Sequence, residues 1–220
     1  MSIHLARALE KLKQGILAVA GEVEARVHDA VRSVRQRDRV LARAVVESDN
    51  DIDQQEVDVE EDCLEVLALH QPVADQLRFV VAILKINNDL ERIADLAVNI
   101  AQRAISLADQ PMIEIPFDLE GIFHKANDML HQSIDSMVKM DSQGARVVRR
   151  LDDAVDDMTA SAFQAVEDGI RANPNNLSQL IQYLSCARHL ERIADLATNI
   201  AEDVIYLVDG EIVRHTPTGG

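Results

Sequence analysis

The chain has 220 residues, of which 47% are hydrophobic, and it carries a formal net charge of -16 at pH 7. It contains five prolines, eight glycines, four Phe, two Tyr and no Trp, a composition that suits helices and is poor in the residues that favour strands. The acidic balance argues against a general nucleic-acid binder, which needs a basic surface for phosphates, and it favours bound cations.

The first half of the chain predicts three helices. Apolar residues recur at alternating intervals of three and four, the spacing of one buried helix face. Asp38 is a plausible N-cap for the second helix, and Pro72 suits the first turn of the third. The predicted helices cover residues 3–35, 38–70 and 72–107. The two prolines of the segment 109–116 then end the helical pattern and mark a boundary.

The second half predicts three more helices. We expect Gly144 to break the first from the second, and the segment Asn173–Asn176 to be the turn before the third. The predicted helices cover residues 118–140, 145–170 and 177–208. The fold class is therefore all-α, with two tandem three-helix bundles. The expected domains are residues 1–109 and 117–210, followed by a flexible tail over 211–220.

A twelve-residue segment occurs twice, one hundred residues apart, and indicates that the two bundles arose by duplication. Residues 90–101 read LERIADLAVNIA, and residues 190–201 read LERIADLATNIA. Apolar residues also recur around these copies, where Leu84 and Leu107 correspond to Leu184 and Leu207. The repeat therefore covers a whole helical segment.

Acidic residues recur four apart on four of the predicted helices, so that each pair lies on one stripe. The pairs are Asp49 and Asp53, Glu91 and Asp95, Asp152 and Asp156, and Glu191 and Asp195. Asp53 and Glu91 lie equally far on either side of Pro72, so a straight helical hairpin places them at the same height. The second hairpin, about Pro174, gives the same result within one residue, or about 1.5 Å. Each hairpin should therefore bring four carboxylates to one level.

Such clusters predict metal sites, because like charges a few ångströms apart repel one another or force protonation. Bound metal removes that cost. Oxygen ligands suit magnesium, manganese, calcium or iron, and zinc is possible. Two alternatives stay open: the acids form solvated faces, or Arg92 and Arg192 neutralise Asp95 and Asp195 locally. Further acids could extend either site: Asp51, Glu56, Glu60, Glu61, Asp62, Asp153 and Asp157.

A basic cluster follows the first predicted helix, and it consists of Arg32, Arg35, Arg37, Arg39 and Arg43. Cations near a helix C-terminus favour the helix dipole, so a solvated helix end is one interpretation. The other is a docking patch for an acidic partner surface. Cys63 and Cys186 fit a reducing compartment, and Cys186 occupies the repeat position of Ile86, as expected of a small core residue. We find neither a membrane-spanning run nor a signal peptide and expect a soluble cytoplasmic protein.

With these residues in view, the chain resembles the PhoU family of bacterial regulators of phosphate uptake and phosphate signalling. The resemblance rests on three segments: the turn HQPVADQLR at 70–78, both LERIAD copies with their NIA followers, and the ending VIYLVDG at 204–210. Leu196 stands where many relatives have His, which removes a possible nitrogen ligand near the second site.

The resemblance implies two three-helix bundles whose acidic motifs bind multinuclear metal clusters. By position, the motifs fall on Glu91, Asp95, Glu191 and Asp195, with helix partners Asp49, Asp53, Asp152 and Asp156. The implied metals are iron, manganese, magnesium or zinc. The implied role is a negative regulator that links the ATPase subunit of the phosphate ABC transporter to a phosphate-sensing histidine kinase. The protein would reach the membrane only through these partners, would not bind nucleic acid, and is expected to be a homodimer.

Two other function classes compete with this non-enzymatic adaptor. A ferritin-like di-metal carboxylate enzyme would need Glu-x-x-His motifs, and no Glu in the chain is followed by His three residues later. The sequence also lacks a P-loop and a glycine-rich phosphate cradle. A metal-free structural bundle would use its acids only for solubility. The metal content of the purified protein separates that class from the adaptor.

Overall fold

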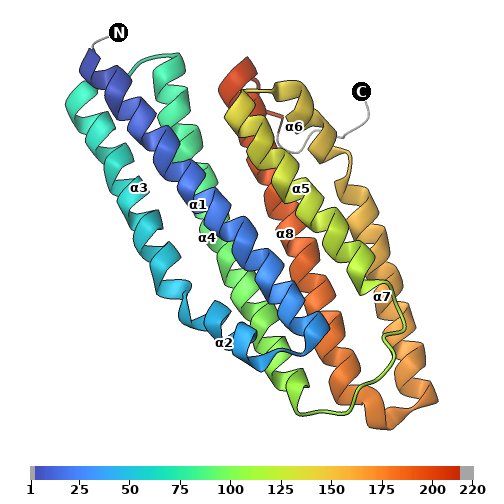
Figure 1. Cartoon of the computed structure of the whole chain (residues 1–220). Helices are drawn as coiled ribbons and strands as arrows, with labels where there is room; N and C mark the ends of the chain where they lie inside the picture. Colours follow the sequence, from blue (N-terminus) through green and yellow to red (C-terminus); the bar gives the residue numbers. More distant parts are fainter. Residues whose placement is uncertain (1–2, 214–220) are drawn as a thin grey trace.

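The structure, a computed structural model, describes residues 3–213, apart from the side chains of residues 49–51. Helices account for almost all of the described chain, which confirms the all-α prediction (Figure 1). They are α1 (Ile3–Gln36), α2 (Arg39–Glu47), α3 (Asp49–His70), α4 (Asp75–Ala108), α5 (Leu119–Lys139), α6 (Ser142–Arg149), α7 (Asp152–Ala172), the 3-10 helix η1 (Pro174–Asn176) and α8 (Leu177–Asp209).

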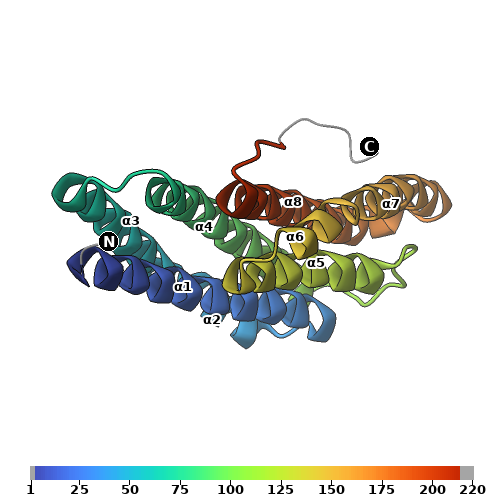
Figure 2. The same ribbon diagram turned by 90° about the horizontal axis from the view of Figure 1, so that it is seen from above.

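The long helices form two bundles that share one interface. Seen from above, α3, α4, α8 and α7 follow one another in a row, and α1 and α5 lie on one face of that row (Figure 2). The two bundles, α1–α4 and α5–α8, meet chiefly where α4 packs against α8. This arrangement agrees with the predicted pair of tandem three-helix bundles, with short helices inserted in each.

The central position of α4 and α8 follows from their apolar residues. Leu90, Ile93 and Ile100 are buried in α4, and the residues one hundred positions later are buried in α8. Alanines at 94, 97, 101 and 104 are also buried, and such small residues let neighbouring helices approach closely. Burying one Leu or Ile side chain contributes roughly 1.5–3 kcal/mol, so these faces supply much of the core. An exposed stripe remains on α4, at Asn88, Arg92 and Asp95.

The helix predicted over 38–70 is wrong as a single element, because Ser48 divides it into α2 and α3. The predicted start is confirmed: Asp38 caps α2 by accepting hydrogen bonds from the backbone N–H groups of Val40 and Leu41. The break falls at Ser48, whose hydroxyl donates to the Val45 carbonyl oxygen and so competes with helical backbone hydrogen bonds. Arg26 of α1 donates to the Ser48 carbonyl oxygen and holds the break against the first bundle.

The second half repeats this correction. The helix predicted over 145–170 is two helices, α6 and α7, separated at Arg150 and Leu151. Gly144 does not break the preceding helix but lies inside α6, while α5 ends at Lys139 and is followed by Met140, which has a left-handed φ of 54°. Asp141 then caps α6 by accepting from the backbone N–H of Gln143. The helix α5 thus ends because Met140 adopts a left-handed backbone conformation, and a methionine does not predict a helix end from the sequence.

The loop between α3 and α4 also differs from the prediction. Pro72 lies outside α4, which begins at Asp75. Gln71 and Ala74 both have positive φ, at 44° and 50°, so the chain leaves and re-enters the helical region within four residues. Pro72 therefore belongs to the turn of the hairpin, as the symmetry argument about its position requires.

The ends of α1 and α5 form matching turns. The N–H of Arg37 bonds to the Val34 carbonyl and that of Asp38 to the Ser33 carbonyl, the pattern of a Schellman motif. Met140 and Asp141 repeat both bonds, to Met137 and Ser136. Each turn places a residue with φ of 54° where glycine is the usual choice. A side chain in the left-handed region costs roughly 1–2 kcal/mol, and the chain bears this cost at both turns.

Candidate functional site

The acidic residues predicted in the first half do gather where α3 packs against α4. Burial raises the pKa of Glu91, and the negative charges of Asp95, Glu56 and Asp53 raise it further. Glu56 is affected in the same way: burial, Glu60 and Asp53 raise its pKa. Four carboxylates therefore lie close enough to repel one another. The remaining predicted ligand, Asp49, begins α3, and its side chain lies outside the described residues.

The second half gathers all four of its predicted acids. Burial raises the pKa of Asp152 to about 6, followed by the charges of Asp195 and Asp156. The pKa values of Glu191 and Asp195 are also raised, first by burial and then by the charge of Asp156. The pairs that the hairpin geometry places at one height, Asp152 with Asp195 and Asp156 with Glu191, are among the pairs that interact, and Asp156 also acts on Asp152 and Asp195.

Within the described residues, neighbouring arginines form no ion pair with the predicted ligands, although their charges partly offset the rise in the pKa values of Glu91, Glu191 and Asp195. Arg92 pairs with the buried Asp89 at 3.2 Å, and Asp95 makes no ion pair within the described part of the chain. Arg192 lies near enough to Asp195 to lower the pKa of that carboxyl. The local alternative considered for Arg92 is therefore wrong, because its guanidinium is used by another carboxylate.

Three polar atoms near the clusters are buried without a hydrogen bond to any described residue. They are Asp152 Oδ1, Thr198 Oγ1 and Asn87 Oδ1. Thr198 lies beside Asp152, and although the two oxygens lack normal hydrogen-bond geometry, the hydroxyl favours the charged carboxylate and offsets part of the rise in its pKa. Buried oxygens without partners are costly. A hard cation accepts oxygen donors of this kind, so the donor set fits a metal ion.

The clusters are not preformed cages. Within residues 3–213, as far as side chains are described, no three Asp, Glu, His or Cys side chains are close enough to hold a metal ion together. Asp53, Asp95 and Asp156 are exposed, so their carboxylates have room to rotate. Sequence reasoning missed Asn87 and Thr198; the signal for both was their helical spacing from Glu91 and Asp195.

Comparison with known proteins identifies the chain's relatives. The PhoU domain matches residues 16–104 and again residues 119–204, so the match covers both halves. The chain belongs to the PhoU family. A "Phosphate-specific transport system accessory protein PhoU homolog" of Pseudomonas aeruginosa is 37% identical over 210 residues, covering 94% of this chain and 86% of the relative. A homologue from Thermotoga maritima is 32% identical over 213 residues, covering 96% of this chain and 92% of the relative.

Solved structures give the same result for the fold. The crystal structure of PhoU from Pseudomonas aeruginosa superposes with a TM-score of 0.90 at 35% identity, covering 94% of this chain and 99% of that one. The phosphate transport system regulatory protein PhoU from Streptococcus pneumoniae gives a TM-score of 0.84 at 26% identity, covering 95% and 99%. The resemblance drawn from the sequence motifs is confirmed.

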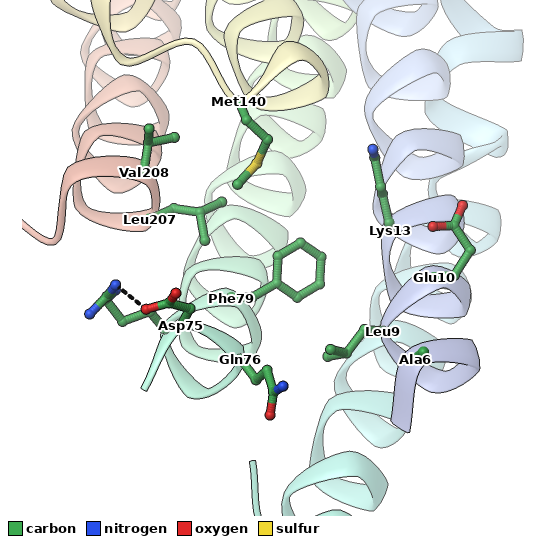
Figure 3. A pocket seen from close by; sticks show the side chains of 11 residues that line it. Ala6, Leu9, Glu10, Lys13, Asp75, Gln76, Phe79, Met140, Leu207 and Val208 are labelled. Carbon is green, nitrogen blue, oxygen red and sulfur yellow. Dashed lines mark hydrogen bonds and ion pairs between the residues drawn. The ribbon is translucent and has the colours of Figure 1, made fainter. Parts of the chain in front are cut away.

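A cavity of about 420 Å³ lies where this PhoU chain's two bundles meet, away from the acidic clusters (Figure 3). Phe79 and Leu9 form its apolar part, together with Leu207 near the end of α8. Its charged residues balance, because Lys13 and Arg78 face Glu10 and Asp75, and Arg78 is already paired with Asp75. The cavity therefore shows no preference for a cation or an anion.

The basic cluster is largely neutralised by acidic partners. Arg32 pairs with Asp29 at 3.2 Å, Arg35 with Glu120 at 2.8 Å, and Arg39 with Asp109. Two of these pairs are structural: Arg35 joins α1 to α5, and Arg39 joins α2 to Asp109 at the end of α4. Arg43 is exposed.

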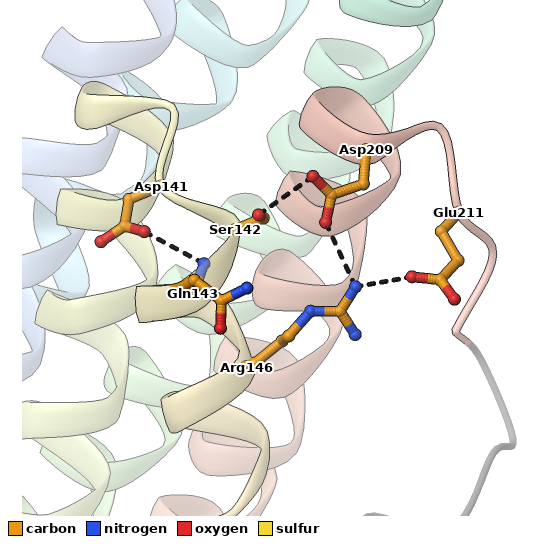
Figure 4. A network of polar contacts seen from close by, with 6 residues as sticks. All are labelled: Asp141, Ser142, Gln143, Arg146, Asp209 and Glu211. Carbon is orange, nitrogen blue, oxygen red and sulfur yellow. Dashed lines mark hydrogen bonds and ion pairs between the residues drawn. The ribbon is translucent and has the colours of Figure 1, made fainter.

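The equivalent region of the second half contains a more connected network. Arg146 of α6 donates to both Asp209 and Glu211, while Ser142 donates to Asp209 (Figure 4). The carboxylates raise the pKa of Arg146, so it remains charged. This network ties α6 to the end of α8, as the pair of Arg39 and Asp109 ties α2 to the end of α4. It extends to Glu211, inside the segment predicted as a tail; residues 214–220 lie outside the described residues.

None of the described helices is both long and apolar enough to cross a membrane.

Proposed function

We propose that the protein is a regulatory accessory protein of phosphate-specific transport. One observation carries this proposal: similarity to PhoU proteins extends over both halves of the chain, and relatives at 31–37% identity are named as accessory proteins of that transport system. The proposed role is repression of phosphate uptake and of the phosphate-starvation response when phosphate is plentiful.

The proposed partners are the ATPase subunit of the phosphate ABC transporter and a phosphate-sensing histidine kinase. Both belong to membrane-associated assemblies, and the chain would join them through protein surfaces. The family resemblance supports these partners; the helix geometry does not specify them. We also propose that the protein acts as a homodimer in the cytoplasm.

The proposed cofactor is a metal ion, or a cluster of ions, at each acidic site. In the first bundle Asp49, Asp53, Glu91 and Asp95 would hold it, and in the second Asp152, Asp156, Glu191 and Asp195. The raised pKa values and the unpartnered Asp152 Oδ1 support this assignment, because a cation would offset the mutual repulsion of the carboxylates. The metal would act structurally, by joining α3 to α4 and α7 to α8.

A deletion strain tests the regulatory role. Loss of the gene should switch on a phosphate-starvation reporter in high phosphate, and the wild-type gene should restore repression. A strain that still represses the reporter without the protein would refute the proposal.

The metal sites need a separate test, because the regulator could act without metal. Elemental analysis of protein purified without chelator should find iron, manganese, magnesium or zinc, and the variant Asp95→Asn/Asp195→Asn should contain less. Helical content measured by circular dichroism should stay unchanged. Metal-free wild-type protein that represses normally would favour the purely structural adaptor instead.

A further inference from the structure

Arg37 has an unusual hydrogen-bonding state for an arginine in a folded protein. Its Nε and Nη2 atoms are both buried, and neither has a hydrogen-bond partner within the described part of the chain. These two nitrogens form one edge of the guanidinium fork, the edge whose parallel N–H groups match the two oxygens of a carboxylate. Arg39, Arg78 and Arg103 each have one such atom, whereas Arg37 has the complete pair.

Arg37 lines a cavity of about 270 Å³ between the end of α1 and the segment that leads into α5. At the roughly 30 Å³ that a water molecule occupies, this volume suits a ligand of about nine non-hydrogen atoms. Most of the wall is apolar, from Val31, Val34, Ile113, Ile115, Phe117 and Leu119. Tyr183 closes one side; burial raises its pKa, and the positive charge of Arg37 lowers it, so the two side chains are neighbours.

The other charged side chains that line the cavity already have partners. Arg35 is paired with Glu120 at 2.8 Å, and Asp118 accepts a hydrogen bond from the Gly121 N–H at 2.8 Å. Arg37 is thus the lining cation that no described carboxylate pairs with, and the carboxylates of Asp118 and Glu120 belong to the same wall. This balance favours a single negative charge over the double charge of phosphate, and the apolar wall favours a hydrocarbon body.

The backbone of Arg37 is strained as well. Arg37 occupies the left-handed position that glycine would fill without strain, and its buried edge adds a second cost. The matching residue of the second half, Met140, has the same φ of 54° but carries no charge. The first half therefore has a strained cation without a partner at Arg37, whereas the second half has an uncharged residue, Met140, at the matching position. Strained residues of this kind are common at binding sites.

We propose that this cavity is a binding site for a small monocarboxylate with an apolar body, whose carboxylate pairs with the Nε and Nη2 edge of Arg37. Because both nitrogens are buried, binding also requires the Arg37 side chain or the wall of residues 112–117 to move. The site is separate from the acidic clusters and does not depend on the regulatory role proposed above.

Titration of the full-length protein with hexanoate and with benzoate, followed by NMR chemical shifts and by calorimetry, tests the proposal. Both acids should bind, with shifts centred on Val34, Ile115 and Tyr183. The variant Arg37→Gly keeps the turn and removes the guanidinium, so the dissociation constant should rise at least about tenfold. Met140→Gly is the matched control: it relieves the same backbone strain in the other half and should leave binding within about twofold. Inorganic phosphate should bind at least about tenfold more weakly than hexanoate.

Four results would overturn the proposal: neither acid binds the wild-type protein, both bind Arg37→Gly as tightly as wild type, Met140→Gly weakens binding as much as Arg37→Gly, or phosphate binds as well as hexanoate. Should Arg37→Gly fold poorly, Arg37→Asn provides a second variant, since Asn also tolerates the left-handed region. Weak binding by a folded Arg37→Asn protein would support the site, and wild-type binding by it would refute the site.

Discussion

The two acidic clusters derive from one repeated motif, yet their surroundings differ. In the first half Arg92 forms an ion pair with Asp89. The residue that corresponds to Asp89 in the second half is His189, which has no negative charge to pair with an arginine. His189 is partly buried near Arg103, Arg188 and Arg192, and burial followed by these positive charges lowers its pKa to about 4. It is therefore neutral at pH 7. Arg192 consequently remains available to the Asp195 carboxylate, whereas Arg92 is occupied elsewhere.

The single difference inside the twelve-residue repeat has a similar effect. Val98 is buried in the first half, while Thr198 places a hydroxyl beside Asp152 in the second. The second cluster thus contains a more buried carboxylate, that of Asp152, together with the nearby Thr198 hydroxyl and the charge of Arg192. We conclude that duplication preserved the positions of the acids, and that changes one helical turn away altered how strongly they interact.

The largest expected effect is on metal-dependent stability. A metal at one hundred times its dissociation constant stabilises the native state by about 2.7 kcal/mol. In a chain of this size that corresponds to a fall in melting temperature of about 5–10 °C when a chelator removes it. Because the second cluster is more strongly coupled, Asp152→Asn/Asp195→Asn should remove more of this chelator effect than Asp53→Asn/Asp95→Asn. Differential scanning calorimetry with and without chelator measures both; an equal loss in the two variants would show that the clusters are equivalent.

The sequence was sufficient to predict the helices and the heights of the acids, because both depend on periodicity and on symmetry about Pro72 and Pro174. It was insufficient for the breaks at Ser48 and at Arg150, since the helical periodicity resumes directly after each break, and the contact of Arg26 with the Ser48 carbonyl oxygen comes from a residue distant in the sequence. The role of His189 could not be predicted either, because its arginine neighbours come from both α4 and α8.

The second prediction concerns the cost of the charged Asp152 in metal-free protein. Its pKa of about 6 in the native state exceeds the usual value of 3.8, so the native state binds a proton more tightly than the unfolded state. The charged carboxylate therefore destabilises the fold fully above pH 6, and the cost disappears as the pH falls toward 4. Asp152→Asn should stabilise the chelated protein at pH 7 by about 1–2 kcal/mol, less than the full shift implies because the group is partly exposed.

Urea denaturation of wild type and variant at pH 7 and at pH 4.5 measures this difference. The comparison between the two proteins is essential, because protonation of His189 has the opposite effect: its lowered pKa destabilises the native state as the pH falls from 6.5 toward 4. A stabilisation by Asp152→Asn that is as large at pH 4.5 as at pH 7 would contradict the assignment of the cost to the charge.

A smaller difference in stability is expected between the ion pairs that hold the short helices α2 and α6. Arg146 pairs with two carboxylates, whereas Arg39 pairs with one, and all these groups are partly exposed. Exposed pairs typically contribute about 0–1 kcal/mol. Arg146→Ala should therefore lower the free energy of unfolding by about 1 kcal/mol and Arg39→Ala by about 0.3 kcal/mol, with the difference shrinking in 1 M NaCl. Equal losses that do not respond to salt would assign the effect to lost packing of the arginine stems.

The smallest expected effect comes from exchanging the one residue that differs between the repeats. Thr198→Val makes the second copy identical to the first and removes the hydroxyl that favours the charged form of Asp152. The pKa of Asp152 should then rise further, by an amount equivalent to about 0.5 kcal/mol, the lower range for one hydrogen-bonding group. Metal binding at pH 6 should weaken by about twofold, because more of the carboxylate is protonated and unavailable to a cation, while binding at pH 8 should change less. The matched variant Val98→Thr changes the same position in the first half, where Asp152 is absent, so it should leave the pKa of Asp152 unaltered in NMR titrations of the carboxyl carbons. If Thr198→Val leaves that pKa unaltered as well, the difference between the clusters must come from His189 and Arg192 and not from the hydroxyl.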